Sequence, residues 1–279
     1  MLQLDGRRPP GVIQKLVFGL RRRLSPARAA VVELGGDVPQ CRFVCSSYRE
    51  FKRAAGLYTK EPGTIAWLRA NLRPGDSFLD VGANIGAYTI YAARSCAGEV
   101  TVTAIEPHLA NASRLMENVQ VNHLVERVRI LTCAVSDTPG FQTFYYRDWT
   151  PASSNSQLEN CIDSEGRPFE AVASEQKSVA RVDDLISRGT IDCPSLVKID
   201  VDGLELQVIR GMEQLLTSPA RPRSIQVEVG PRTGDAVQQY LAQWGYQCCS
   251  RHYSKGQQRR LANGESAVDV PHNLVFEPS

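Results

Sequence analysis

The sequence predicts an α/β fold in which a Rossmann-like, mostly parallel sheet carries helices on both faces. Three observations support this prediction. A strand-like run, Asp76–Asp80, leads into a glycine-containing turn; a second strand, Glu99–Glu106, ends in a carboxylate; and a buried strand, Ser195–Val201, runs into a pair of aspartates. Each places polar residues at the carboxyl end of a strand, where open α/β sheets bind their ligands.

The glycine turn indicates the type of cofactor. Dinucleotide-binding turns carry glycine at the first, third and sixth positions, so that the backbone can contact a pyrophosphate. Here those positions hold Gly82, Asn84 and Ala87. A glycine stands instead at Gly86, and the Asn84 side chain would occupy the place of a pyrophosphate. A cofactor without phosphates, such as S-adenosylmethionine, tolerates this change, and Asp80 suits a ligand that carries an amino group and a sulfonium.

The second strand ends in the candidate ribose-binding residue. Glu106 lies 20 residues beyond Gly86, close to the position where Rossmann units place the carboxylate that accepts both ribose hydroxyls. The third strand, Val128–Ala134, should line the adenine with Ala134. Asp137 either accepts a hydrogen bond from the adenine amino group or stabilises a turn.

Four motifs occur in order along the chain: "FLDVGANIGAYT", "AIEP", "AVSDTPG" and "VKIDVDGLELQVIRGM". Together they resemble the FkbM-type family of S-adenosylmethionine-dependent methyltransferases over roughly residues 62–230. The resemblance implies a seven-stranded class I methyltransferase sheet and O-methylation of a hydroxyl on a sugar, glycan or natural product. The chain departs from the family pattern at Asp202, where the family usually has Glu, and at His108, where it often has Asn.

Several carboxylates should meet at the carboxyl edge of the sheet. They are Asp80, Glu106, Asp200, Asp202 and Glu228. Converging carboxylates repel one another unless a cation lies among them or one is protonated. The cation is either the sulfonium of the cofactor or Mg²⁺ held by Asp200, Asp202 and Glu228. We favour the pocket without metal.

Transfer of a methyl group to an alcohol also needs a general base, because the alcohol must lose its proton. The candidates are Asp202, Glu228, His252 and His272, which are expected near strand ends or in the loop before the last strand. We choose Asp202 first and His272 second.

The 279 residues, 42% of them hydrophobic, suit one such domain. We expect an N-terminal helical extension over residues 1–60 and the methyltransferase domain over residues 61–279. Short helices over Tyr48–Tyr58 and Glu61–Leu72 should cap the pocket, by analogy with this fold. Residues 147–177 read as a mobile insertion that either forms a lid or is disordered. The last strand, Asn273–Glu277, should pair antiparallel beside its neighbours, after a basic loop over Arg251–Asp269 that meets an acidic ligand or is merely solvated.

Composition limits the partners. A net charge of +2 argues against a nucleic-acid binder. Eight cysteines without Cys-x-x-Cys spacing are expected to be buried, reduced thiols in a cytoplasmic protein. Neither a secretory signal nor the ~18 consecutive apolar residues of a spanning helix is expected. Residues 11–23 form an amphipathic, basic helix that either rests on an anionic membrane surface or packs on its own domain.

Alternative functions remain open at this point. The acceptor atom could be a carboxylate or a nitrogen of a small molecule or peptide. An NAD-dependent oxidoreductase is disfavoured by Asn84 and by the lack of a second catalytic domain. A non-catalytic cofactor-binding module is disfavoured by the presence of Asp80, Gly82, Gly86, Glu106 and Asp200.

Overall fold

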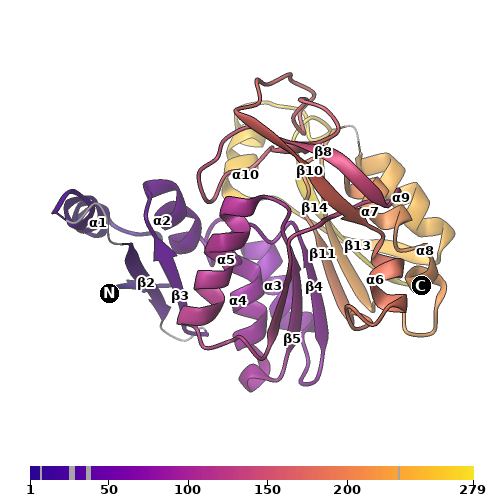
Figure 1. Ribbon diagram of the computed structural model, residues 1–279, viewed down its shortest axis with the longest axis horizontal. Helices are drawn as coiled ribbons and strands as arrows, with labels where there is room; N and C mark the ends of the chain where they lie inside the picture. Colours follow the sequence, from indigo (N-terminus) through magenta and orange to yellow (C-terminus); the bar gives the residue numbers. More distant parts are fainter. Residues whose placement is uncertain (7, 25–28, 36–38, 232) are drawn as a thin grey trace.

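The central element of the computed structural model is a seven-stranded sheet with the order β13-β14-β12-β11-β4-β5-β6 (Figure 1). The model describes residues 1–6, 8–24, 29–35, 39–231 and 233–279, without the side chains of residues 21–24. The strands are β4 (Ser77–Val81), β5 (Thr101–Ile105), β6 (Val128–Leu131), β11 (Leu196–Ile199), β12 (Ser224–Val229), β13 (Tyr246–His252) and β14 (His272–Pro278). As expected for the last strand, β14 pairs antiparallel with both neighbours. The predicted Rossmann-like fold is confirmed.

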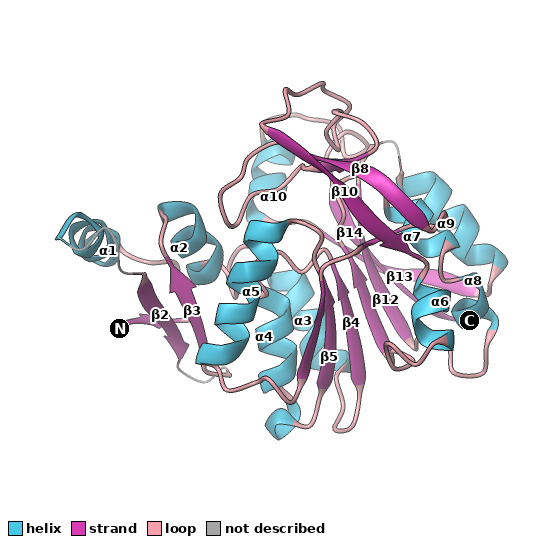
Figure 2. Cartoon of the chain, in the orientation of Figure 1, coloured by secondary structure: helices cyan, strands magenta, loops and turns pink. Residues whose placement is uncertain are grey.

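Helices cover both faces of this sheet (Figure 2). One face carries α3 (Pro62–Asn71), α4 (Ala87–Arg94) and α5 (Leu109–Val121), with the short turn η1 (Cys96–Gly98) after α4. The other face carries α6 (Val182–Ser187), α7 (Glu205–Arg210), α8 (Glu213–Thr217) and α9 (Gly234–Gln243). Alternate strand residues point to opposite faces. Phe78 therefore packs in the first helical layer and Leu79 in the second.

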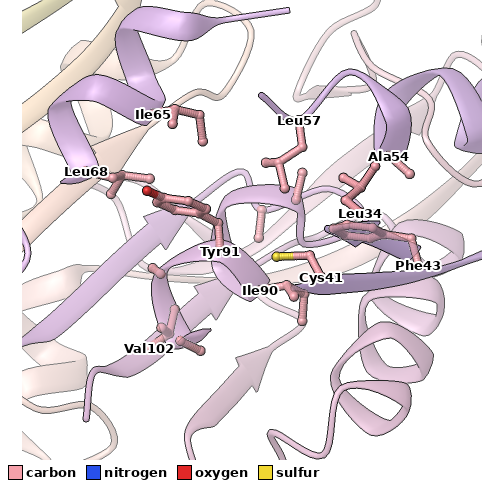
Figure 3. Close-up of a cluster of buried hydrophobic side chains, with 14 of the residues drawn as sticks. Leu34, Cys41, Phe43, Ala54, Leu57, Ile65, Leu68, Ile90, Tyr91 and Val102 are labelled. Carbon is pink, nitrogen blue, oxygen red and sulfur yellow. The ribbon is translucent and has the colours of Figure 1, made fainter. Parts of the chain in front are cut away.

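The N-terminal extension is not purely helical, so that part of the prediction is wrong. It contains β1 (Leu2–Asp5), α1 (Val12–Leu24), β2 (Ala30–Gly35), β3 (Cys41–Cys45) and α2 (Tyr48–Ala55), and its strands form a separate three-stranded sheet. The reason is visible in β3, where buried and half-buried residues alternate with the period of a strand. Leu34, Phe43 and Ala54 share one apolar cluster with Ile90 and Tyr91 of α4 (Figure 3).

The predicted insertion lies within a second sheet of order β7-β10-β8-β9. Its strands are β7 (Ala134–Val135), β8 (Gly140–Tyr146), β9 (Gln157–Leu158) and β10 (Ala173–Ala180). The β8–β10 pair lies across one end of the central sheet (Figure 1). Residues 147–177 thus include β9 and the start of β10 and connect the paired strands.

The expected basic loop at Arg251–Asp269 is partly a helix, α10 (Lys255–Ala262). Sequence reasoning missed the N-terminal signal of this helix, a capping box in which Ser254 Oγ accepts from the Gln257 backbone N–H and the Gln257 side chain accepts from Ser254 N.

The eight cysteines are free thiols, as expected, but only Cys41 and Cys45 are buried. The others are half-buried or exposed, so the expectation of buried thiols is wrong for most of them. Within the described ranges, every helix is too short or too polar to cross a membrane.

Candidate active site

A cavity of about 280 Å³ opens at the carboxyl edge of the central sheet, beneath the insertion. Seven residues predicted from the sequence contribute to its wall, namely Gly82, Asn84, Glu106, Ala134, Asp200, Asp202 and Glu228. The strand order places Glu106 and Ala134 on the β5–β6 side of the cavity and Asp202 and Glu228 on the β11–β12 side.

The two glycines of the first turn are required by packing. Gly82 has φ +81°, and a Cβ there would lie 1.9 Å from the carbonyl oxygen of Asp200 on the neighbouring strand. Gly86, the N-cap of α4, has φ +84°, and its Cβ would lie 2.3 Å from Leu115 Cδ1. Both positions thus exclude side chains on steric and conformational grounds. Gly82 was expected to make room for the cofactor, but its immediate constraint is the backbone of the next strand.

Glu106 is buried and held by three donors. Its carboxylate accepts from the backbone N–H groups of Asn84 (2.6 Å) and His108 (2.9 Å) and from Asn111 Nδ2 (3.5 Å). Burial raises the pKa of Glu106 to about 7, although the hydrogen bonds oppose this shift. At neutral pH the Glu106 side chain is therefore ionised in about half of the molecules.

The insertion covers this part of the cavity. The carbonyl oxygen of Ser153 accepts from Asn84 Nδ2 (2.7 Å) and from Asn111 Nδ2 (3.2 Å), and the backbone N–H of Ala152 donates to Asn111 Oδ1 (2.7 Å). Ser153 is itself buried. These bonds place the segment where a lid would lie. Its mobility stays a prediction.

His108 joins the same network. Its Nδ1 accepts from the backbone N–H of Asn111 at 3.3 Å, which caps α5. Its Nε2 lies 2.8 Å from the carbonyl oxygen of Asp148 and 3.0 Å from Ser153 Oγ, an arrangement that assigns the ring proton to Nε2. Burial lowers the pKa of His108, so the ring is neutral at physiological pH.

A buried ion pair stabilises the opposite wall. Lys198 is 1% exposed, and its Nζ lies 2.8 Å from Asp200 Oδ2 and 5.1 Å from the centre of the Tyr88 ring. Burial alone would raise the pKa of Asp200, but the Lys198 ammonium and a hydrogen bond with Glu228 together outweigh burial and hold that pKa below its usual value. Sequence reasoning missed Lys198, although the strand period places it on the same face as Asp200.

The pKa of Glu228 is shifted in the opposite direction from that of Asp200. The negative charge of Asp200, together with burial and a hydrogen bond between the two side chains, raises the pKa of Glu228 well above its usual value. Glu228 Oε1 also accepts from Gln257 Nε2 of α10 at 3.0 Å. The structure therefore favours the protonated form of Glu228, and this proton and the Lys198 ammonium would relieve the repulsion expected from the converging carboxylates.

Asp202, on the same side of the cavity as Glu228, has an unusual backbone conformation with φ +56°. Its Oδ2 accepts from the backbone N–H of Asn155 at 2.6 Å. Burial, followed by the negative charge of Asp200, raises the pKa of Asp202 to about 6. A residue with strained φ and a pKa close to neutrality is typical of a functional position.

Residues 80–248 match the family model of the methyltransferase FkbM domain. This chain belongs to the FkbM methyltransferase domain family. Among similar proteins is the 31-O-demethyl-FK506 methyltransferase FkbM of Streptomyces tacrolimicus, which is 33% identical over 51% of this chain and 61% of that relative. The hexuronic acid methyltransferase AglP of Haloferax volcanii is 29% identical over 63% of this chain and 66% of that relative. This FkbM-family chain thus matches less than two thirds of the length of these curated relatives.

Among similar solved structures is that of a methyltransferase FkbM from Methylobacillus flagellatus KT. It has 17% sequence identity and a TM-score of 0.48 over 74% of this chain and 44% of that chain.

Three residues predicted for the site of the FkbM-family chain lie outside the cavity wall. Asp80 is buried, and its Oδ2 accepts from Thr89 Oγ1 at 2.6 Å. Asp137 accepts from the hydroxyls of its neighbours Ser136 and Thr138, as a turn-stabilising aspartate does. Gly86 serves the turn as described above.

The two candidate histidines also lie away from the cavity wall. His272 is buried; its Nδ1 lies 3.0 Å from the carbonyl oxygen of Val270, and its ring lies 5.3 Å from that of Tyr253. The His252 ring packs against α3 so closely that a Cβ at Gly63 would lie 2.5 Å from it. The structure therefore does not bring either histidine to the pocket. In the described part of the chain, no group of three or more His, Cys, Asp or Glu residues is arranged to hold a metal ion.

Two positively charged residues that precede residues 80–248 in the sequence also contribute to the pocket. Arg53 of α2 and Lys60, in the turn after it, contribute to the wall. Arg53 Nη2 donates to Ser154 Oγ at 2.8 Å, and Lys60 Nζ lies 2.7 Å from Glu61 Oε1. The sequence predicted helices that cap the pocket in this region, but not which side chains would enter it.

Proposed function

We propose that this chain is an S-adenosylmethionine-dependent methyltransferase that methylates a hydroxyl of a sugar, glycan or natural product. The observation that carries the proposal is one cavity, in a chain of the FkbM family, whose wall includes Gly82, Glu106 and Asp202. The relatives named for 31-O-demethyl-FK506 and for hexuronic acid support an acceptor of this class.

The residues of the β5–β6 side fit the cofactor. Glu106 offers a carboxylate to the ribose hydroxyls, and an apolar wall that includes Ile105, Val135 and Phe144 suits the adenine ring. When bound, S-adenosylmethionine supplies an electrophilic methyl group. The protein contributes enclosure, because the insertion covers the cavity and excludes water from the reacting groups.

Asp202 is the general base in this proposal. Asp200 is paired with Lys198, and the charge of Asp200 favours the protonated form of Glu228, so both are poorer candidates to accept a proton. Asp202 is ionised at physiological pH, and its raised pKa makes it a better proton acceptor than an ordinary aspartate. The Asn155 N–H holds its carboxylate in place. The Lys198 ammonium and a proton on Glu228 would balance the charge of the carboxylates without Mg²⁺. This supports a pocket that works without metal.

The test is transfer from methyl-labelled S-adenosylmethionine to a panel of sugars, glycans and hydroxylated natural products. We expect an alkali-stable methyl ether on a hydroxyl. A label that alkali releases as methanol would indicate a carboxyl acceptor, and a label on nitrogen would indicate N-methylation. Binding of S-adenosylmethionine, measured by calorimetry, separates loss of the cofactor site from choice of the wrong acceptor.

We also propose that α1 docks on an anionic membrane surface. Phe18 anchors the helix by stacking on Phe51 with a 4.5 Å ring separation. The outward face exposes a row of apolar residues, Val12, Ile13, Leu16 and Leu20, each 58–75% accessible. The neighbouring cations, Arg21–Arg23 of the sequence, lie outside the described side chains. An exposed apolar stripe beside positive charge suits anionic lipid.

Co-sedimentation with vesicles tests this docking. The protein should bind phosphatidylglycerol vesicles and not phosphatidylcholine vesicles, and Leu16→Glu should abolish binding. Val268→Glu, at an exposed apolar residue far along the chain, is the control and should bind normally. Binding that survives Leu16→Glu, or a dimer that Leu16→Glu dissociates, would refute the assignment of this face to lipid.

A further inference from the structure

The acids and the cations of the pocket come from different parts of the chain. Its carboxylates lie within the segment that matches the family model, residues 80–248. Among the described wall residues, the positively charged side chains are Arg53 and Lys60, which both precede that segment. The N-terminal extension thus adds positive charge to a pocket whose wall within residues 80–248 is acidic.

Arg53 has spare binding capacity. Its guanidinium donates a hydrogen bond to Ser154 Oγ at 2.8 Å. Within the described chain, no carboxylate lies within ion-pairing distance of its guanidinium. Arg49, one turn earlier on α2, differs because it pairs with Asp148. A planar guanidinium presents a fork of N–H donors that matches a carboxylate or phosphate, and a single hydroxyl leaves most of that fork free.

Lys60 lies near the β11–β12 side of the pocket, where the proposed base Asp202 lies. Its backbone carbonyl accepts from the N–H of Lys255, which joins the turn to α10, and α10 in turn contacts Glu228 at the end of β12 through Gln257. The Lys60 side chain is 56% exposed although it pairs with Glu61. Glu61 also accepts from the Tyr88 hydroxyl at 2.9 Å, so it divides its charge between two donors.

We propose that Arg53 and Lys60 form an anion-binding subsite, so that the acceptor is a hydroxyl compound that carries a carboxylate or a phosphate. This inference rests on the proposed methyltransferase function and narrows its substrate class. An anion can enter this side because the Lys198 ammonium lies 2.8 Å from Asp200 Oδ2, and the charge of Asp200 favours the protonated form of Glu228. Holding the acidic group on Arg53 would fix the acceptor in the pocket and present its hydroxyl to Asp202.

The experiment uses the full chain saturated with S-adenosylhomocysteine and three probes titrated by calorimetry. They are methyl glucuronide, glucose 1-phosphate and neutral methyl glucoside. The wild-type protein should bind one or both acidic probes at least about tenfold more tightly than the neutral probe. The stronger acidic probe identifies the preferred anion.

The variants are Arg53→Gln and Lys60→Gln, with Lys52→Gln as the matched control on the exposed side of α2. Arg53→Gln should remove the preference for acidic probes, and Lys60→Gln should reduce it. Lys52→Gln should leave it unchanged. Arg53→Lys, which keeps the charge without the fork, should retain part of it. All variants should bind S-adenosylmethionine within about twofold of the wild type.

Equal wild-type binding of acidic and neutral probes would overturn the proposal, even if Arg53→Gln fails to fold. So would an Arg53→Gln protein that loses about tenfold in S-adenosylmethionine affinity and keeps its preference for acids, since Arg53 would then bind the cofactor carboxylate. If the acidic preference is found but no acceptor is ever methylated, the subsite stands and the proposed activity fails.

Discussion

Replacement of Asp202 by asparagine is the most direct test of the catalytic assignment. The amide keeps an oxygen that can accept from the Asn155 N–H, which the carboxylate accepts at 2.6 Å in the structure. It cannot take a proton from an acceptor hydroxyl. We therefore expect kcat to fall by about 10²- to 10⁴-fold, while the affinity for S-adenosylmethionine changes little.

The pH profile gives the same prediction a second signature. With a pKa of about 6, about nine in ten Asp202 side chains are ionised at pH 7 and about one in ten at pH 5. The wild-type kcat should therefore rise with pH and level off above about pH 7. The residual activity of Asp202→Asn should lack this ascending limb.

Stability supplies the control for misfolding. The folded state binds the Asp202 proton more tightly than the unfolded chain, because its pKa is raised from 3.8 to about 6. The free energy of unfolding therefore decreases as the pH rises from about 4 to about 6, and it stays lower above pH 6. The decrease amounts to at most about 3 kcal/mol. Asp202→Asn should thus be more stable than the wild type at pH 8 and lose that advantage at pH 4, as measured by urea unfolding.

The assignment of Asp202 would be refuted by a variant that folds, binds S-adenosylmethionine and keeps kcat within about threefold of the wild type. An unchanged ascending limb in that variant would also refute it. The base would then have to be sought on the acceptor itself or in another residue of the pocket.

Three further predictions concern the cofactor side and the buried ion pair. Glu106→Ala should weaken S-adenosylmethionine binding by about 1.5 to 3 kcal/mol in calorimetry, whereas Asp137→Ala, outside the pocket, should not. Gly82→Ala and Gly75→Ala both impose strain, since their φ values are +81° and +82°; that strain costs about 1 kcal/mol. A Cβ meets nothing within 4 Å at Gly75 but a carbonyl oxygen at 1.9 Å at Gly82, so Gly82→Ala should lower the unfolding free energy much further. Lys198→Met should cost about 1 to 3 kcal/mol, because it removes the ammonium from Asp200, whose side chain is 27% exposed.

Each of these has a clear opposite outcome. Calorimetry that shows equal affinity for Glu106→Ala and the wild type would remove the ribose role. Equal unfolding midpoints for the two glycine variants would mean that the β4 and β11 backbones separate easily. A Lys198→Met protein as stable as the wild type would show that its partner carboxylate takes up a proton at little cost.

The sequence by itself determined the sheet and the positions of its active edge. Strand–turn–helix order and the carboxylates Glu106 and Asp202 are local patterns, and parallel strands bring their carboxyl ends to one edge whatever the details of packing. This is why most of the predicted wall residues do meet in one cavity. The antiparallel last strand was expected from the seven-stranded methyltransferase pattern, and β14 confirms it. The prediction of a helical extension failed for the N-terminal strands, because β2 and β3 are short and part of a separate small sheet.

Only the tertiary structure decided the chemistry of the individual groups. The pKa of a carboxyl depends on burial and on charges that are remote in sequence, so the separate roles of Asp200, Asp202 and Glu228 were not readable from their spacing. The entry of Arg53 and Lys60 into the pocket depends on how the extension packs against α4 in a shared core. Such contacts join residues far apart along the chain, and no local pattern encodes the distance between them.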